Sequence, residues 1–286
     1  MSVPFRVDLS GKTAIVTGGG GVLCSAFAKA LAECGAAIAV CDLNLEAAEK
    51  VAESIRACGG SAEAFKTNVL DRASLESVRA AIIQRFEHID ILINGAGGNN
   101  PRATTAKEYF ELGDISEELS GSAQTFFDLD PEGVKFVFDL NFIGTLLPTQ
   151  VFAKDMCGRD GACIVNVSSM NAFRPLTKIP AYSAAKSAVS NFTMWRAVHF
   201  AKTGMRVNAI APGFFVTAQN KSLLFDDDGN PTARTSKILA ATPMGRFGEP
   251  DELIGTLLYL CDKNASGFVT GSVIAVDGGF AAYSGV

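Results

Sequence analysis

The chain has 286 residues, 48% of them hydrophobic, and a formal net charge of -5. This apolar content suffices for the core of one large α/β domain, so we expect a single domain over residues 1–286. The acidic balance, without a block of Lys or Arg, argues against nucleic-acid and membrane partners and favours a small molecule.

Seven cysteines are scattered through apolar segments without the paired spacing of a zinc site. We therefore expect buried thiols, no metal site and a reducing, cytoplasmic setting. The opening MSVPFRVDLSGK has no apolar stretch of signal-peptide length, and no run of eighteen apolar residues follows, so no membrane span is expected.

The first unit has the pattern of a strand, a glycine turn and a helix. An apolar run over 13–17 leads into four glycines, 18–21, and then a helical pattern to residue 36. Glycines let a backbone approach a pyrophosphate, and the first helical N–H groups point at it. The expected contacts of a dinucleotide are therefore Gly18, Gly20, Gly21, Val22 and Leu23.

The next strand, 37–41, ends in Asp42, which is followed by Leu43 on the same edge. An acidic side chain about twenty residues beyond the glycines can accept hydrogen bonds from both ribose hydroxyls and repels a 2′-phosphate. Asp42 therefore favours NAD over NADP. The alternative is that Asp42 only caps the helix that begins near Leu45, a role that Asn44 could take instead.

Strands and helices continue to alternate, with a strand ending at Thr67, a helix over 72–86 and a strand over 89–93. This alternation predicts one Rossmann-type, doubly wound parallel sheet of about seven strands with helices on both faces. Ligands bind at the carboxyl ends of such strands. The residues at two of these ends are Asn68 and Val69, and then Asn94, Gly95, Ala96 and Gly97, with tight turns as the alternative.

Residues 98–130 form a polar insertion after the fourth strand, which we expect to be a wall of the active site. Asp130 and Pro131 then have the pattern of an N-cap and a first-turn proline, and they open a long helix to about residue 156. Asn141 lies inside this helix, where Asn is unfavourable unless its side chain or a local distortion has a use. It is a candidate for anchoring a water or a catalytic lysine.

A hydroxyl, a phenol and an amine lie close together in the stretch SSMNAFRPLTKIPAYSAAK, residues 168–186. Tyr182 and Lys186 are four apart in an expected helix, so they share one face. A nearby ammonium lowers the pKa of a phenol, ordinarily about 10, so Tyr182 could exchange a proton near neutral pH. Ser169 follows a strand over 162–167, and its hydroxyl could bind a substrate oxygen.

A sixth strand, 206–211, ends at Pro212 and Gly213. The loop over 213–246, which includes Phe215 and Thr217, is expected to form a lid with a short helix near 236–240. A helix over 250–261 and a last strand over 273–276 complete the sheet.

In this order and spacing, the motifs resemble the short-chain dehydrogenase/reductase family from about residue 9 to residue 280. They are Ser169 with Tyr182-x-x-x-Lys186, Asn141, Asn94-Gly95-Ala96-Gly97, Pro212-Gly213-x-x-x-Thr217 and Asp277-Gly278-Gly279. The resemblance implies NAD(P)(H)-dependent interconversion of a secondary alcohol and a ketone, commonly in homotetramers.

The resemblance also implies residue roles. Tyr182 would exchange the proton, Ser169 would steady the carbonyl oxygen, and Asn141 would fix a water. Lys186 would hold the nicotinamide ribose and lower the tyrosine pKa. The implied cofactor contacts are Asp42 with Leu43 at the adenosine ribose, Asn68 and Val69 at the adenine, and Tyr182, Lys186, Pro212, Gly213, Phe215 and Thr217 around the nicotinamide half.

The glycine motif departs from the family pattern. In Thr-Gly-x-x-x-Gly-x-Gly, Val22 and Cys24 occupy the second and third glycine positions. Valine does not easily take a positive φ angle, which puts the path of the turn in question. Asn68 also replaces the usual Asp.

Within the family, the glycine variant, the insertion ending FFDLDPEGVKFVFDLN and the stretch 168–186 resemble the D-mannonate oxidoreductase (fructuronate reductase) group. This implies a sugar-acid substrate, whose carboxylate needs a cation or several donors. The candidates are Asn99, Arg102, Asn171, Arg174 and Lys178, each with a solvated surface role as the alternative. A neutral sugar, a polyol or a hydrophobic alcohol remains open, as does a non-catalytic NAD-binding sensor.

Overall fold

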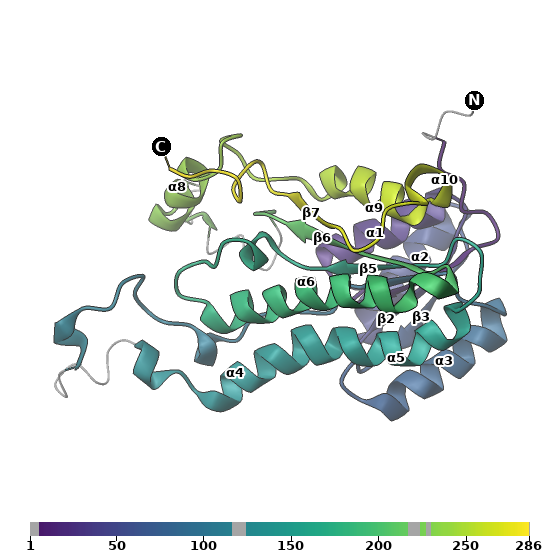
Figure 1. Ribbon diagram of the computed structural model, residues 1–286, viewed down its shortest axis with the longest axis horizontal. Helices are drawn as coiled ribbons and strands as arrows, with labels where there is room; N and C mark the ends of the chain where they lie inside the picture. The colour runs from purple at the N-terminus through teal and green to yellow at the C-terminus, as the bar shows by residue number, and fades with distance from the viewer. Residues whose placement is uncertain (1–5, 116–123, 217–223, 227–229, 286) are drawn as a thin grey trace.

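The computed structural model describes residues 6–115, 124–216, 224–226 and 230–285. Seven parallel strands form one sheet in the order β3-β2-β1-β4-β5-β6-β7 (Figure 1). They are β1 (Thr13–Thr17), β2 (Ala37–Asp42), β3 (Ala62–Lys66), β4 (Ile91–Asn94), β5 (Cys163–Val167), β6 (Arg206–Pro212) and β7 (Val273–Val276). The predicted doubly wound parallel sheet is confirmed.

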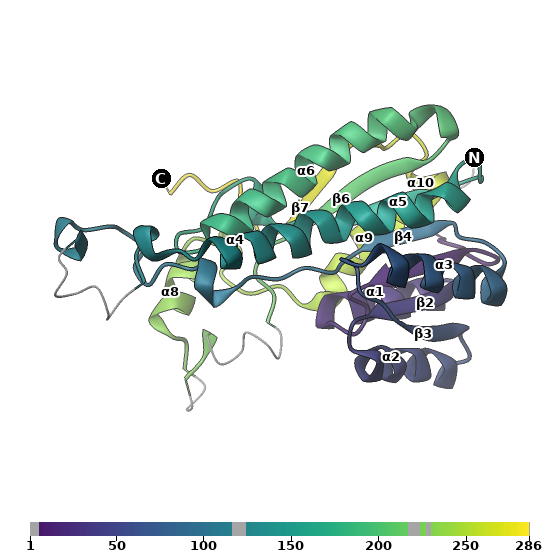
Figure 2. The same ribbon diagram turned by 90° about the horizontal axis from the view of Figure 1, so that it is seen from below.

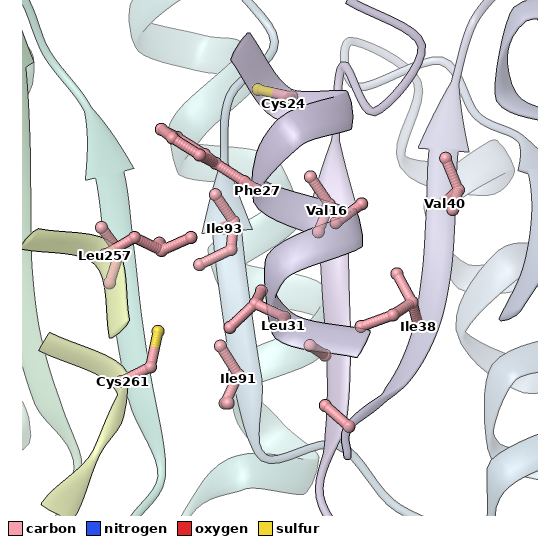
Figure 3. Close-up of a cluster of buried hydrophobic side chains, with 14 of the residues drawn as sticks. Val16, Cys24, Phe27, Leu31, Ile38, Val40, Ile91, Ile93, Leu257 and Cys261 are labelled. Atoms are coloured by element: carbon pink, nitrogen blue, oxygen red, sulfur yellow. The ribbon is translucent and has the colours of Figure 1, made fainter. Parts of the chain in front are cut away.

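Helices cover both faces of this sheet. One face carries α1 (Val22–Glu33), α2 (Leu45–Ala57) and α9 (Ile254–Cys261), and the other carries α3 (Arg72–Phe86), α5 (Gly144–Met156) and α6 (Pro180–Phe200). Side chains alternate between the two faces along each strand, so that Val16 packs in one core cluster and Ile15 in the other. Figure 3 shows Phe27 and Leu31 of α1 lying over the strands of the first cluster.

The long helix expected over residues 131–156 is interrupted. It consists of α4 (Pro131–Phe138), a π turn over Asp139–Ile143 and α5. Asp130 caps α4 as predicted, because its carboxylate accepts the N–H of Glu132 at 2.9 Å. The distortion lies at Asn141, where the sequence suggested that one was possible.

The remaining elements differ from the predictions mainly at their ends. β4 begins at Ile91 rather than at residue 89, because the buried Asp90 turns its carboxylate to the N–H of Thr13 at 2.9 Å. The helix expected over 250–261 starts as a 3-10 turn, Pro250–Leu253, and the short helix expected near 236–240 is the longer α8 (Ala233–Ala240). Elements absent from the sequence prediction are α10 (Lys263–Ser266) and the short 3-10 turns Pro101–Ala103, Leu112–Ile115, Phe126–Asp128, Met170–Ala172 and Ala201–Thr203.

The stretch Pro131–Met156 is long and apolar enough, by length and composition, to cross a membrane. However, 50% of its most apolar window is buried inside the protein. It packs with α3 and α6 on one face of the sheet, as a core helix does.

The expectation of buried thiols holds for four of the seven cysteines. Cys24, Cys41, Cys163 and Cys261 are buried, and Cys34 is half-buried. Cys58 and Cys157 are exposed, so for these two the prediction is wrong. Each follows the last residue of a helix, α2 or α5, where the chain returns to the surface.

Candidate active site

The four residues of the predicted catalytic set come from three segments around the carboxyl edge of the sheet. Ser169 follows β5, while Tyr182 and Lys186 lie in the first two turns of α6. Asn141 lies in the π turn, which contacts α6. Because parallel strands end at one edge, these segments converge there.

Lys186 is 4% exposed and its ammonium is held in place. Nζ donates a hydrogen bond to the carbonyl of Val167 at 2.8 Å and lies 5.7 Å from the centre of the Tyr182 ring. A β-carbon placed on Gly97 would be 3.1 Å from this Nζ and 2.7 Å from Oδ1 of Asn141. Lys186, Asn141 and Gly97 therefore meet at one point.

Asn141 is fully buried, and its side-chain amide satisfies the distorted helix. Nδ2 donates to the carbonyls of Val137 and Gly98, both at 2.7 Å, and Oδ1 accepts the N–H of Gly98 at 3.2 Å. The side chain thus supplies a hydrogen bond to the carbonyl of Val137 at the π turn, and it fixes Gly98 at the start of the insertion after β4. Its role toward a water stays a prediction.

Ser169 and Tyr182 are the two residues predicted to handle the proton. Ser169 is 8% exposed, and its hydroxyl oxygen accepts the N–H of Asn171 at 3.2 Å. Burial raises the pKa of Tyr182 above its ordinary value, and a hydrogen bond with Ser169 lowers it by less. Burial also lowers the pKa of Lys186 to about 8.

In the protein without cofactor, the pKa of Tyr182 is raised, so the expectation that Lys186 lowers it is wrong there. The ammonium bonds to Val167 rather than to the phenol, and burial outweighs the other influences on the tyrosine. The phenol is consequently protonated at neutral pH, which is the form that donates a proton to a ketone.

The path of the glycine turn explains how Val22 is tolerated. Within the run, Gly18 takes the positive φ, at 65°, whereas Gly21 has φ of -75°. Val22 is already the first residue of α1, so it needs no left-handed conformation. Gly18 is required for another reason too, since a β-carbon there would lie 3.0 Å from Ala96.

The loop fits a dinucleotide. Gly21 precedes α1 without a side-chain cap, and the first turn contains no acidic residue, so its amides are available to a pyrophosphate. Asp42 lies beside them, with one carboxylate oxygen accepting the N–H of Gly20 at 3.0 Å. Asn44, not Asp42, caps α2 by accepting the N–H of Ala47 at 3.2 Å, so the capping alternative for Asp42 is wrong.

The other cofactor candidates lie along the same edge, in different surroundings. Leu43 and Asn68 are exposed, whereas Val69 is buried. Asn94 turns its side chain inward and donates to Thr149 at 3.0 Å and to Asn166 at 2.9 Å. Pro212 ends β6, Gly213 follows it, and Phe215 is buried against Gly248, while Thr217 lies outside the described residues.

The substrate candidates divide into two groups. Arg102 pairs with Asp130 at 2.8 Å and Asn99 donates to Thr104 at 3.1 Å, so both serve the insertion. The other three are in the loop after Ser169. Asn171 is 2% exposed with Oδ1 unbonded within the described part of the chain, Arg174 is exposed, and Lys178 has φ of 72°.

Four segments that follow neighbouring strands close a ring around this edge. They are the insertion after β4, the loop after β5, the segment after β6 that is predicted to be a lid, and the tail after β7. The contacts are Thr105 N to Lys178 O at 2.8 Å, Arg174 Nε to Ala281 O at 2.8 Å, Met244 N to Gly278 O at 3.1 Å, and Lys237 Nζ to both Glu108 oxygens at 3.0 Å. The insertion and α8 (Ala233–Ala240) extend from the same end of the molecule (Figures 1 and 2). Sequence reasoning missed Lys237 and Glu108, because nothing local pairs residues 129 positions apart.

A family model described as short chain dehydrogenase matches residues 12–227. The chain belongs to the short-chain dehydrogenases. It is 59% identical to an uncharacterized oxidoreductase of Haemophilus influenzae, and the alignment covers 100% of this chain and 99% of that protein. A crystal structure from Haemophilus influenza, provisionally named a D-mannonate oxidoreductase and containing bound NAD, superposes with a TM-score of 0.93 at 60% identity, covering 98% of both chains.

A more distant relative is the 2-dehydro-3-deoxy-D-gluconate 5-dehydrogenase of Bacillus subtilis, 32% identical over 96% of both chains. Membership of the family makes this protein an NAD-dependent oxidoreductase that acts on a small molecule.

Replacing Lys186 by Met removes a buried charge, so we expect a more stable but inactive enzyme. With its pKa lowered to about 8, Lys186 in the folded chain binds a proton less tightly than in the unfolded chain. The destabilising contribution of Lys186 is therefore full below about pH 8 and is lost as the pH rises to the ordinary lysine pKa near 10.4. Below that window the variant should gain about 1–2 kcal/mol, after the lost hydrogen bond is counted. Denaturant unfolding at pH 7 and pH 10 checks this, and a variant less stable than wild type at pH 7 would contradict it.

Breaking the Lys237–Glu108 pair should open the ring and speed release of NADH. Lys237→Gln removes a pair whose side chains are 68% and 30% exposed, so the effect is modest, about twofold to fivefold in the release rate. Stopped-flow fluorescence measures it. The matched control is Lys50→Gln, which breaks an exposed pair with Glu46 on α2. Equal release rates in both variants would show that the contact does not restrict access.

Proposed function

We propose that this protein interconverts the secondary alcohol of a sugar acid and the corresponding ketone, with D-mannonate and D-fructuronate as the substrate pair. The observation that carries the proposal is the similarity, at 60% identity over almost the whole chain, to the solved structure that bears the provisional D-mannonate oxidoreductase name. The 32% identical relative also has a sugar-acid name.

The side chains at the carboxyl edge suit this reaction. Bound NADH supplies the hydride in ketone reduction, and NAD accepts it in the reverse direction. Tyr182 donates its proton to the carbonyl oxygen during reduction and takes it back during oxidation. Ser169, which is hydrogen-bonded to Tyr182, steadies the same oxygen, and the buried ammonium of Lys186 would hold the nicotinamide ribose.

A substrate carboxylate needs a cation that is not already neutralised. Arg102 is paired with Asp130, whereas Arg174 and Lys178 have no carboxylate partner within the described part of the chain. Arg174 Nε is oriented by the carbonyl of Ala281 at 2.8 Å, which leaves the two terminal nitrogens of its guanidinium for a bidentate contact. We therefore assign the carboxylate to Arg174, and Asn171 and Lys178 of the same loop are further candidates for this contact.

A neutral or hydrophobic alcohol is the second candidate substrate. Phe173 lies in the loop between Ser169 and Arg174 and is 48% exposed, so it offers an apolar surface there. The homotetramer and the cytoplasmic location expected from the family resemblance stay predictions.

NAD is the proposed cofactor in preference to NADP. The carboxylate of Asp42 stands at the end of β2 beside Gly20, where it accepts ribose hydroxyls and repels a 2′-phosphate. NAD is the cofactor bound in the 60% identical structure.

The substrate proposal predicts NADH-dependent reduction of D-fructuronate and NAD-dependent oxidation of D-mannonate. Tyr182→Phe should lower turnover by about 10²–10⁴-fold because the proton donor is lost, while NADH still binds. Absorbance of NADH measures turnover. Turnover of neutral polyols but of neither sugar acid would sink the substrate assignment, and unchanged turnover by Tyr182→Phe would refute the role of the phenol.

The cofactor proposal predicts that Asp42→Asn relaxes the preference for NAD by about tenfold or more, since like-charge repulsion of the 2′-phosphate is removed. The amide oxygen still accepts the N–H of Gly20, so the loop keeps its shape. Asn44→Ala is the control, because it removes the cap of α2 without changing charge. An unchanged ratio of kcat/KM values for NAD and NADP in Asp42→Asn would mean that another group sets the preference.

A further inference from the structure

At the cofactor loop, α1 and the end of β4 pack so closely that no side chain fits between Cys24 and Gly95. A β-carbon placed on Gly95 would lie 2.1 Å from Sγ of Cys24 and 2.8 Å from the carbonyl oxygen of Thr17. Cys24 is 5% exposed, and Figure 3 shows it near the start of α1, in the same cluster as Phe27 and Ile93. The sulfur therefore occupies the space that a side chain on residue 95 would need.

This contact accounts for one departure of the glycine motif. A glycine at the third position of such motifs permits close packing of helix and strand. Here Cys24 stands at that position, and the small residue is on the opposite side of the contact, at Gly95. The two residues are matched in size.

The segment that begins at Gly95 leads directly to the catalytic side chains. The backbone N–H of Gly95 donates a hydrogen bond to Oγ1 of Thr17 at 3.0 Å, and Ala96 lies against Gly18. Gly97 abuts Nζ of Lys186 and Oδ1 of Asn141, and Gly98 exchanges two hydrogen bonds with the same Asn141. Residues 95–98 are thus confined between α1 at one end and the catalytic pair at the other.

We propose that Cys24 is a positioning residue, whose sulfur sets the location of residues 95–98 and, through them, of Lys186 and Asn141. Close-packed interiors transmit a displacement of this kind because no void absorbs it. The thiol acts by its size and not as a nucleophile, since burial raises the pKa of Cys24 to about 12. The inference rests on the NAD-dependent reaction of the family and not on the sugar-acid assignment.

The test begins with Gly95→Ala. The new methyl group would overlap the sulfur, so segment 95–98 must shift toward the catalytic pair. We expect NADH to bind roughly tenfold more weakly and kcat to fall by roughly as much. We also expect a shift in the apparent pKa of the limb at which kcat changes with pH. A purely structural role would lower the melting temperature without moving that limb.

Rescue by a second substitution gives the decisive comparison. In Cys24→Ala/Gly95→Ala the sulfur is gone, and the nearest atom of residue 24 is 3.6 Å from the new methyl group, an ordinary contact. The carbonyl of Thr17 remains at 2.8 Å, so the methyl group must settle into the space of the sulfur, and rescue is partial. We expect the double variant to recover at least threefold of the loss in NADH affinity, and the pH limb to return.

Two matched controls separate this contact from general effects. Gly255→Ala adds a methyl group in α9 where nothing lies within 4 Å, and Cys41→Ala removes a buried sulfur from the other core cluster. Both should leave NADH affinity and kcat unchanged.

The proposal is overturned if Gly95→Ala behaves as wild type, or if the double variant is no better than Gly95→Ala. Should Gly95→Ala fail to fold, the double variant decides by function: NADH affinity within about threefold of wild type supports the proposal, whereas a folded double variant without that affinity, or an unfolded one, overturns it. Because NADH binding is measured without substrate, failure of the sugar-acid assignment would not affect this result.

Discussion

The site depends on one buried interaction, the hydrogen bond between the ammonium of Lys186 and the carbonyl of Val167 at the end of β5. Burial of this charge is costly, as the lowering of its pKa to about 8 records. The cost is tolerated because the first turns of α6, the π turn and the glycine segment after β4 all close on this ammonium. The Tyr182 ring lies 5.7 Å from this ammonium, and burial raises the pKa of its phenol, which keeps it in the protonated form that can donate to a ketone.

A second buried polar network holds the helices that carry these groups. Arg196 of α6 is 1% exposed and donates a hydrogen bond to the hydroxyl of Thr149 of α5 at 2.7 Å. The same hydroxyl accepts a hydrogen bond from Asn94 of β4. Burial lowers the pKa of this arginine to about 10, and its guanidinium lies 4.1 Å from the centre of the Phe192 ring. Thr145, one turn before Thr149, donates to the carbonyl of Asn141 at 2.8 Å. The network thereby ties the π turn to the sheet and α6.

Sequence periodicity predicted the sheet, α3 and the shared face of Tyr182 and Lys186, because each depends on local pattern and helix geometry. The pKa of Tyr182 was predicted in the wrong direction, since the balance between burial and charge is set by tertiary packing. The match of Cys24 with Gly95 and the ring contact of Lys237 with Glu108 also join distant segments. The unusual glycine motif marked Cys24 as a position to examine, but its compensation at Gly95 could be found only in three dimensions.

We propose that Tyr182 transfers the proton with help from Ser169, and that the loop between these two residues recognises the substrate carboxylate. A crystal structure of the Tyr182→Phe variant with NAD and D-mannonate tests this most directly. We expect the reacting hydroxyl to lie within hydrogen-bonding distance of Ser169 and beside the ring at position 182, with the carboxylate at Arg174. A sugar acid bound away from Ser169, or with its carboxylate held by the insertion at Arg102, would contradict it.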